Sequence, residues 1–284
     1  MIRNGVPEGA ERCDPGVGWT LVTVTYNSAN VLDQAWRGVD LGAAQWIVVD
    51  NNSSDDSVAV ARSMGAHVIS RRDNPGFSIS NNVGLSHSMT EWTAFVNPDV
   101  TIDIDSLSRL SALSRANGAF VAPQLTFESG VQQANARGLP TPAQKFANRG
   151  IRLPRVNPVD YARVGLQRPT YVAWVMGAAL CGPTDDFRRI GGWNESYFIY
   201  YEDHEMGLRA WQHGIPTVID PATQWVHSWQ RETTSLNSAA WKAEIRSART
   251  FYREYPDLLS RRRADSSSRF SQLRSQLWTE AVDV

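Results

Sequence analysis

Short apolar runs alternate with amphipathic stretches through the first part of the chain. Four runs rich in β-branched and apolar residues are typical of buried strands: Thr20–Thr25, Trp46–Val49, His67–Ser70 and Thr93–Val96. Stretches with helical spacing follow the first three runs, at Ala29–Gly38, from the capping residues Ser53–Asp55 to about Met64, and at Phe77–Ser88. Strands that alternate with helices of about ten residues indicate βαβ units. We therefore expect an α/β fold, with a Rossmann-like, mainly parallel central sheet flanked by helices.

The pattern is looser after residue 117. Residues 137–169 contain several Pro, Gly and Arg, and they predict a long loop with one short helix, which is the kind of segment that forms lids or stays disordered. The remaining expected elements are strands at Ala119–Ala122 and Pro216–Ile219, a buried run at Tyr171–Cys181 that includes an element at Tyr171–Val175, and helices at Thr184–Ile190, Glu202–His213 and Ser238–Tyr255.

Composition narrows the class of protein. Hydrophobic residues make up 42% of the chain and charged residues 20%, as in ordinary globular proteins. The formal net charge is -1, which removes the usual electrostatic case for a nucleic-acid-binding protein. No run reaches the roughly 18 apolar residues of a membrane span, and the polar N-terminus does not read as a signal peptide. Two distant cysteines, Cys13 and Cys181, make a reducing cytoplasm the expected location.

Tryptophan is unusually frequent, with 11 residues. One interpretation is a densely packed core with a few exposed rings. The other is that some of the rings form platforms for a ligand with apolar faces, such as a sugar or a base. Composition alone does not decide between them.

Polar side chains follow three of the first four expected strands. Tyr26 and Asn27 follow the first strand, Asp50 the second and Asp99 the fourth. Asp and Asn commonly start turns, so either acid alone is weak support for a site. Together they predict a ligand-binding rim, because ligands of open α/β sheets bind outside the carboxyl ends of the strands. No G-x-G-x-x-G or P-loop motif is present, and Asp99 suits a Mg²⁺ or Mn²⁺ ion bound to a diphosphate.

A second cluster of candidate chemistry lies at Gly191–Arg209. Glu202 and Glu205 fall on one face of the expected helix, and Arg209 can pair with Glu205. Acids at a helix N-terminus are often explained by the helix dipole alone. The cluster also follows an aromatic run, however, and apolar surroundings would raise a carboxyl pKa toward the range of a general base. Both interpretations stay open from the residues alone.

Six motifs in this order resemble glycosyltransferase family 2, most closely its rhamnosyltransferase-like branch. The resemblance covers roughly residues 20–230. Its motifs are Val24-Thr25-Tyr26-Asn27, Val48-Val49-Asp50-Asn51-Asn52-Ser53-Ser54-Asp55, Asn74-Pro75-Gly76-Phe77 with Asn81 and Gly84, Asn97-Pro98-Asp99, Gly191-Gly192-Trp193-Asn194-Glu195, and Tyr200-Tyr201-Glu202-Asp203 with Arg209.

The resemblance implies a GT-A fold, a nucleoside-diphosphate sugar donor, a divalent cation (Mg²⁺ or Mn²⁺) and transfer with inversion. It implies that Asp203 is the base that deprotonates the acceptor hydroxyl, with Glu202 beside it, and that Asp99 and His227 lie at the metal. A lone His is otherwise more often structural. The nucleotide-sugar-binding residues that it implies are Thr25, Tyr26, Asn27, Asp50, Arg71, Asn74, Gly76, Asn97, Asp99 and Arg209.

The chain departs from the family pattern at several positions. Asn97 replaces the first acid of the D-x-D motif, which suggests weaker metal binding, although Asn-Pro-Asp is common in the rhamnosyl-like branch. Asn194 stands where the family usually has Asp, and Cys181-Gly182-Pro183 stands where the branch often has Arg. No Q-x-x-R-W motif is present, which disfavours a processive synthase.

These observations predict an inverting, non-processive enzyme that moves one sugar to a glycan or lipid-linked acceptor, with L-rhamnose as the candidate sugar. We expect a flexible leader at 1–18, a catalytic domain at 19–256 with a nucleotide-sugar-binding half (19–118) and an acceptor-binding half (119–256), and an Arg/Ser-rich tail at 257–284. A degenerate nucleotide-sugar-binding protein is the main alternative, and a nucleotidyltransferase is a third. The donor, its base, the acceptor, the linkage and the oligomeric state are left open.

The tail carries an apolar stripe at helical spacing: Phe270, Leu273, Leu277 and Trp278, with several arginines nearby. One interpretation is packing against the catalytic domain or a partner subunit. The other is peripheral attachment to the inner face of an anionic membrane, where a lipid-linked acceptor would be found.

Overall fold

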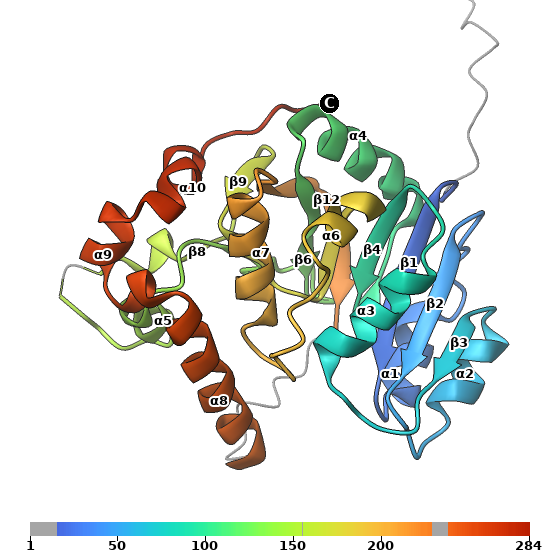
Figure 1. Ribbon diagram of the computed structural model, residues 1–284. Helices are drawn as coiled ribbons and strands as arrows, with labels where there is room; N and C mark the ends of the chain where they lie inside the picture. Colours follow the sequence, from blue (N-terminus) through green and yellow to red (C-terminus); the bar gives the residue numbers. More distant parts are fainter. Residues whose placement is uncertain (1–15, 155, 229–237) are drawn as a thin grey trace, which may run out of the picture.

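The computed structural model describes residues 16–154, 156–228 and 238–284 (Figure 1). Most of the leader expected at 1–18 therefore lies outside the described residues. Where the description starts, the backbone N–H of Trp19 donates to the carbonyl of Gly16 over 3.0 Å, which closes a turn ahead of the first strand.

A mixed, mostly parallel sheet forms the centre of the molecule. Its strand order is β3-β2-β1-β4-β11-β6-β12-β5, with β9 paired to β12. The strands β1 to β4 are parallel neighbours, while β11 runs antiparallel to both β4 and β6. The strands are β1 (Trp19–Thr25), β2 (Gln45–Asp50), β3 (His67–Ser70), β4 (Trp92–Val96), β5 (Val100–Thr101), β6 (Phe120–Thr126), β9 (Thr170–Val172), β11 (Ala179–Pro183) and β12 (Thr217–His227).

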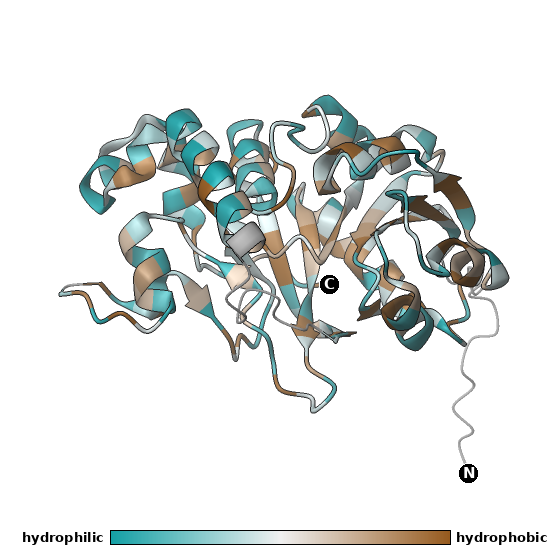
Figure 2. Cartoon of the chain, turned by 90° about the horizontal axis from the view of Figure 1, so that it is seen from below, coloured by the Kyte–Doolittle hydropathy of each residue, from teal (hydrophilic) through white to brown (hydrophobic). Residues whose placement is uncertain are grey.

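Helices cover both faces of this sheet, because alternate strand residues point to opposite sides. Leu21 packs with apolar residues of α1, α2 and α4 on one face, and Val22 packs with those of α3, α6 and α7 on the other. Figure 2 shows hydrophobic strands between helices whose outer sides are hydrophilic. These helices are α1 (Ala29–Trp36), α2 (Ser57–Ser63), α3 (Phe77–His87), α4 (Leu107–Asn117), α6 (Thr184–Arg189) and α7 (Glu202–Gln212).

Most of the tryptophans belong to the core, which confirms the packing interpretation. The rings of Trp36 and Trp46 stack with centroids 4.2 Å apart. Trp241 is exposed, and Trp229 lies outside the described residues. The buried tryptophans are Trp19, Trp36, Trp46, Trp92, Trp174, Trp193, Trp211 and Trp225.

Three elements differ from the sequence expectation. The helix α4 was not expected, because its apolar positions are interleaved with Ser and Arg; it ends at Gly118, whose φ is 56°. The antiparallel strand β11 was absorbed into a longer buried run. The strand β12 extends to His227 rather than ending at residue 219, because a register shift between Asp220 and Gln224 lets pairing with β6 resume.

The long segment expected at 137–169 is mostly irregular but contains structure. Strand β7 (Ala136–Arg137) pairs with β8 (Ala162–Arg163) and β10 (Trp174–Val175) in a small second sheet. The short expected helix is α5 (Pro142–Asn148), which is capped where the Thr141 hydroxyl accepts a hydrogen bond from the backbone N–H of Gln144.

The C-terminal helices pack against α7 and β10. They are α8 (Ser238–Glu254), α9 (Arg261–Ser266) and α10 (Ser271–Gln276). Phe270 and Leu273 are both 1% exposed and join a cluster with Tyr255 and Phe251. The apolar stripe of the tail is thus used for packing within the chain, and its first two residues are unavailable to a membrane.

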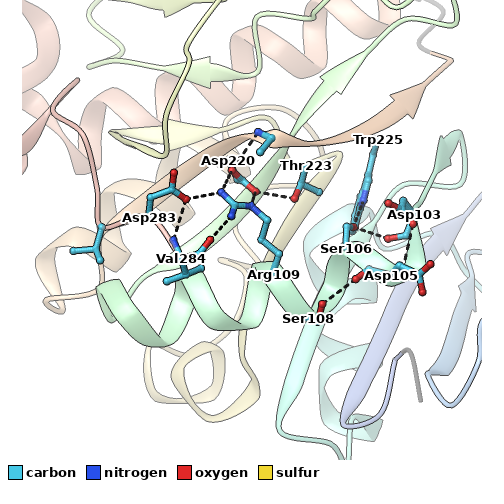
Figure 3. Close-up of polar contacts among 12 residues, drawn as sticks. Asp103, Asp105, Ser106, Ser108, Arg109, Asp220, Thr223, Trp225, Asp283 and Val284 are labelled. Carbon is cyan, nitrogen blue, oxygen red and sulfur yellow. Dashed lines mark hydrogen bonds and ion pairs between the residues drawn. The ribbon is translucent and has the colours of Figure 1, made fainter. Parts of the chain in front are cut away.

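The chain end is held by a charged network (Figure 3). Arg109 on α4 donates to both carboxylate oxygens of the fully buried Asp220, over 2.9 and 3.1 Å. The same guanidinium donates to Asp283 over 2.7 Å and to the carbonyl of Val284. The network joins α4, the irregular part of β12 and the last residues of the chain.

Candidate active site

The ends of β1 and β2 form the first part of the expected rim. Asp50, 2% exposed, accepts hydrogen bonds from the Thr25 hydroxyl and the backbone N–H of Ser53, each over 3.1 Å. Tyr26 follows β1 with 53% of its surface exposed. Asp50 is therefore held rigidly, while the ring of Tyr26 is available to solvent or a ligand.

Asn27 ties the two loops of this rim together. Its φ is 51°, a left-handed conformation that Asn tolerates better than most residues. Its side-chain oxygen accepts from the backbone N–H of Ser54 over 2.8 Å, and its own N–H donates to the Ser53 hydroxyl over 2.9 Å. The side chain fixes the distance between the β1 and β2 loops.

The segment after β3 brings three further expected residues to the same edge. The backbone N–H of Arg71 donates to the carbonyl of Asp50 over 2.9 Å, and its guanidinium pairs with Asp73. Asn74 accepts from the N–H of Gly76 over 3.1 Å. Gly76 has a φ of 95°, and a Cβ there would overlap the carbonyl of Phe198, so only glycine fits this approach to the α3 N-terminus.

Asp99 and His227 meet beyond the end of β4. His227 Nε2 lies 3.5 Å from Asp99 Oδ2, and the backbone N–H of Ser228 donates to the Asp99 carbonyl over 2.9 Å. The Gln133 side-chain NH₂ donates to the His227 carbonyl over 2.7 Å. This bond orients the amide oxygen of Gln133 toward His227 Nδ1, at 2.8 Å. Because that oxygen only accepts, Nδ1 donates a proton to it, and Nε2 is the ring nitrogen that faces the Asp99 carboxylate.

This arrangement suits a divalent cation. The imidazole nitrogen and the carboxylate oxygen lie 3.5 Å apart, and both are atom types that bind divalent cations. The Asp99 side chain is 20% exposed, so it can be reached from solvent. Within the described residues no group of three or more His, Cys, Asp and Glu side chains gathers around a metal position. A cation here would need phosphate oxygens or water to complete its ligands.

Asp203 lies at the first turn of α7, joined to the same rim. Its Oδ2 accepts from the backbone N–H of Gly177 over 3.3 Å. The next residue, Ala178, accepts from the N–H of Asn97 over 2.9 Å. Two consecutive residues therefore connect the Asp203 carboxylate to the Asn97–Asp99 segment, so the carboxylate faces the rim rather than the opposite side of α7.

The two adjacent carboxyl groups have opposite pKa shifts. Burial raises the pKa of Glu202 to about 8, and the neighbouring Asp203 charge adds to the rise. Burial also acts to raise the pKa of Asp203, but the His204 ring and hydrogen bonds from His204 and Gly177 outweigh it, and the net shift is downward. At neutral pH Glu202 is therefore a neutral acid and Asp203 a carboxylate, the pattern that assigns acid and base roles. The expected raised pKa belongs to Glu202.

His204 was not singled out by the sequence, although it holds Asp203 in place. Its Nδ1 donates to Asp203 Oδ1 over 2.6 Å. The ring is stacked between Trp174, at 3.6 Å, and Tyr201, at 4.7 Å. Burial lowers the pKa of His204 to about 4, so the ring is neutral at pH 7 and its Nε2 can accept. The stacking fixes the plane of the ring, and the hydrogen bond to Asp203 fixes the tautomer and the direction of the carboxylate.

Lys145 on α5 completes this cluster. Its Nζ lies 3.3 Å from His204 Nε2 and 3.5 Å from the centre of the Tyr201 ring. Burial lowers the pKa of Lys145 to about 7. The backbone next to this cluster is strained, because Tyr200 and Tyr201 have φ values of 67° and 68°. Two consecutive bulky residues adopt this left-handed conformation only where their surroundings enforce it. No local pattern near residue 145 indicates this role.

The Arg209 guanidinium is held by four hydrogen bonds to protein groups. It pairs with Glu205 over 2.6 and 3.0 Å, as its spacing predicts. It also donates to the carbonyl of Gly192 over 2.6 Å and to that of Ile190. The guanidinium thereby connects α7 to the Gly191–Gly192 turn, and the structure places it with these protein groups rather than with the rim.

The chain has a GT-A fold, and two solved structures share it. The crystal structure of GalNAc-T7 with UDP, GalNAc and Mn²⁺ matches with a TM-score of 0.58 at 16% identity, over 90% of this chain and 54% of that one. The mannosyltransferase PcManGT from Pyrobaculum calidifontis, in complex with GDP-Man and Mn²⁺, matches with a TM-score of 0.53 at 16% identity, over 81% and 61%. The chain thus spans about half to three-fifths of these structures.

The model of the family described as Glycosyl transferase family 2 matches residues 20–168, more than half of the chain. This chain belongs to that family, and it is a glycosyltransferase that takes its sugar from a nucleotide sugar. The fold and family expectations are confirmed.

Several curated relatives are similar over most of their length. The low-salt glycan biosynthesis hexosyltransferase Agl10 of Haloferax volcanii is 25% identical over 78% of this chain and 70% of its own. The N-acetylglucosaminyl-diphospho-decaprenol L-rhamnosyltransferase of Mycobacterium tuberculosis strain H37Rv is 26% identical over 73% and 75%. The rhamnosyltransferase WbbL of Escherichia coli K12 is 21% identical over 70% and 76%.

Proposed function

We propose that this chain is an inverting, metal-dependent, non-processive hexosyltransferase. It moves one sugar, with L-rhamnose as the candidate, from a nucleoside-diphosphate sugar to a hydroxyl of a glycan or lipid-linked saccharide. The connection of the Asp203 carboxylate to the Asn97–Asp99 segment through Gly177 and Ala178 is the observation that carries the proposal. It brings a base and a candidate diphosphate-binding edge to one place.

The donor lies along the rim in this proposal. Tyr26, Asp50 and the Arg71–Gly76 segment hold the nucleoside, with Asp50 already oriented by Thr25 and Ser53. Asp99 and His227 hold the cation, which offsets the negative charge that develops on the diphosphate leaving group. Relatives that are named as rhamnosyltransferases support L-rhamnose, and the titles of the structural neighbours, which include UDP, GDP-Man and Mn²⁺, support a nucleotide donor with a cation.

Asp203 performs the proton transfer. The acceptor hydroxyl gives its proton to Asp203 while its oxygen attacks the anomeric carbon on the face opposite the diphosphate. The bond from that carbon to the diphosphate oxygen breaks, and its electron pair leaves with the diphosphate. A single displacement inverts the anomeric centre. His204 keeps Asp203 in position, and the neutral Glu202 beside it can donate a hydrogen bond to the acceptor.

The experiment combines binding with product analysis. Thermal-shift titrations with a panel of nucleotide sugars, each with Mg²⁺, Mn²⁺ or EDTA, should show stabilisation that depends on both donor and cation. NMR of the product should then show the anomeric configuration opposite to that of the donor. A retained configuration contradicts inversion, and cation-independent donor binding contradicts the role of Asp99 and His227.

A degenerate nucleotide-sugar-binding protein is the second candidate, because Asn97 stands where the family has an acid. It predicts the same cation-dependent stabilisation but neither sugar transfer nor donor hydrolysis above background. Measuring hydrolysis of each stabilising donor separates the two candidates without knowledge of the acceptor.

A further inference from the structure

One surface of the acceptor-binding half carries exposed apolar side chains beside clustered cations. The apolar residues are Phe146 and Ile151, in and just after α5, and Trp241 and Ile245 on α8, and between 41% and 50% of each is exposed. Contacts join the two elements: the Arg149 guanidinium lies 5.3 Å from the centre of the Trp241 ring and pairs with Glu244. We call this the α5–α8 surface. In Figure 1 it lies at the opposite end of the molecule from β1–β3.

The exposed side of α8 has the pattern of an interfacial helix. At about 100° per residue, six of its exposed side chains fall within an arc of roughly 140°. That arc has apolar residues at one edge, cations over the rest and no acid. Its exposed residues are Trp241, Ile245, Arg249, Lys242, Arg253 and Arg246, while Tyr252, which falls in the same arc, is partly buried and donates to the Pro140 carbonyl.

Charge favours an anionic partner for this surface. The chain as a whole has a net charge of -1. In residues 146–153 and 240–254, by contrast, exposed cations outnumber acids. The cations are Arg149, Arg152, Lys242, Arg246, Arg249 and Arg253, and the acids are Glu244 and Glu254. Such a local excess next to exposed Trp and Ile suits a surface that is anionic outside and apolar beneath, which describes an acidic bilayer.

The opposite side of α8 contacts the residues around Asp203. Phe251 packs on Tyr201 and His204, with ring centroids 5.2 and 5.8 Å apart, and the Ser247 hydroxyl donates to the Ile199 carbonyl over 2.8 Å. The helix therefore has one side toward the residues that position Asp203 and the other toward solvent. A bilayer on the outer side would lie next to the acceptor-binding part of the enzyme.

We propose that the α5–α8 surface docks this enzyme on an anionic lipid bilayer. The helix lies along the interface with Trp241 and Ile245 among the acyl chains and its cations at the headgroups. The docking does not depend on the identity of the donor or on catalysis, so its test and that of the proposed function fail separately. Among the described residues no helix is both long and apolar enough to cross a membrane, and the docking is peripheral.

Co-sedimentation with vesicles tests the proposal. The full chain should bind phosphatidylcholine vesicles containing about 30% phosphatidylglycerol, and binding should fall steeply with salt and be weak without the anionic lipid. Lys242→Gln with Arg246→Gln should weaken binding about twentyfold or more, since each cation near such a surface contributes about fivefold. Trp241→Ser with Ile245→Ser should weaken it about tenfold. These residues are exposed, so the variants should keep the wild-type melting temperature.

Matched variants elsewhere provide the control. Arg62→Gln with Arg262→Gln removes two exposed cations, and Met89→Ser with Val159→Ser removes two exposed apolar side chains. Both should bind vesicles like the wild type. Equal loss in test and control variants, or no binding of the wild type to anionic vesicles, overturns the proposal. Binding to a DNA oligonucleotide as tight as to the vesicles also overturns it, because it would indicate a general polyanion surface.

Discussion

The two sides of the candidate active site are built in different ways. On the donor side, Asp50, Asn27 and Asp99 follow parallel strands that are neighbours in the sheet, and short loops hold them. On the acceptor side, Asp203 depends on groups from segments far apart in the chain, such as Lys145 and Gly177. The donor side is thus a local product of strand ends, whereas the acceptor side exists only when distant segments pack together.

The largest expected effect tests the acceptor side. Asp203→Asn removes the base and should lower kcat by about 10²- to 10⁴-fold, the usual contribution of a general base. The dissociation constant of the donor should change less than about twofold, because Asn keeps the shape and the donor side is untouched. Steady-state kinetics with donor titration measure both. Asp185→Asn, at a carboxylate that is 94% exposed, is the control. Wild-type turnover in Asp203→Asn would remove this residue from catalysis.

The next effect concerns how firmly the distant segments are joined. Arg109→Leu leaves the Asp220 carboxylate buried without its cation and should lower the free energy of unfolding by about 3 kcal/mol. Arg168→Leu breaks an ion pair with Glu280 in which both partners are more than half exposed, and it should cost less than about 1 kcal/mol. Urea unfolding measures both variants. Equal losses would show that the charged network does not anchor the chain end.

Glu202 links the stability of the acceptor side to pH. Its pKa is raised by burial to about 8 in the folded state, so the folded state holds a proton that the unfolded state loses above about pH 4.5. Stability from this group is complete at low pH and is lost as pH rises from about 4.5 through 8. The free energy of unfolding of Glu202→Gln, relative to that of the wild type, should therefore increase by about 2 to 4 kcal/mol between pH 5 and pH 9. Parallel stability curves for the two proteins would contradict the raised pKa.

The smallest effect concerns the candidate cation site at Asp99 and His227. Gln133→Leu removes the acceptor that fixes His227 Nδ1, and loss of such an orienting partner weakens metal binding about tenfold to a hundredfold. Gln133→Glu keeps an acceptor for Nδ1 and should retain more of the affinity. Mn²⁺ binding followed by electron paramagnetic resonance measures the change without any donor. Gln167→Leu, at an exposed position, is the control, and equal Mn²⁺ affinity in all variants would place the cation away from His227.

The strand ends show how much of the site could be predicted. Asp50 and Asp99 were placed correctly at one edge, because β1, β2 and β4 have continuous apolar runs that end at polar residues, and parallel neighbours end at the same edge. The strand His67–Ser70 matches β3 in full, and the other early strands match within a residue or two. Lys145 and Gln133 could not be predicted, because their contacts with His204 and His227 span 59 and 94 residues of chain. His204 is next to Asp203 in the chain, but the stacking on Trp174 that orients its ring is a tertiary contact.

The order of apolar runs and polar turns determined the α/β architecture, the donor-side rim and the family, because these depend on periodicity and on motifs that are contiguous in the chain. Tertiary packing alone decided which carboxyl group is ionised: Glu202 and Asp203 are adjacent and chemically alike, and only burial and the hydrogen bonds from His204 and Gly177 separate their pKa values. It also decided that the apolar stripe of the tail is buried while that of α8 is exposed, since neighbours from elsewhere in the chain cover one and not the other.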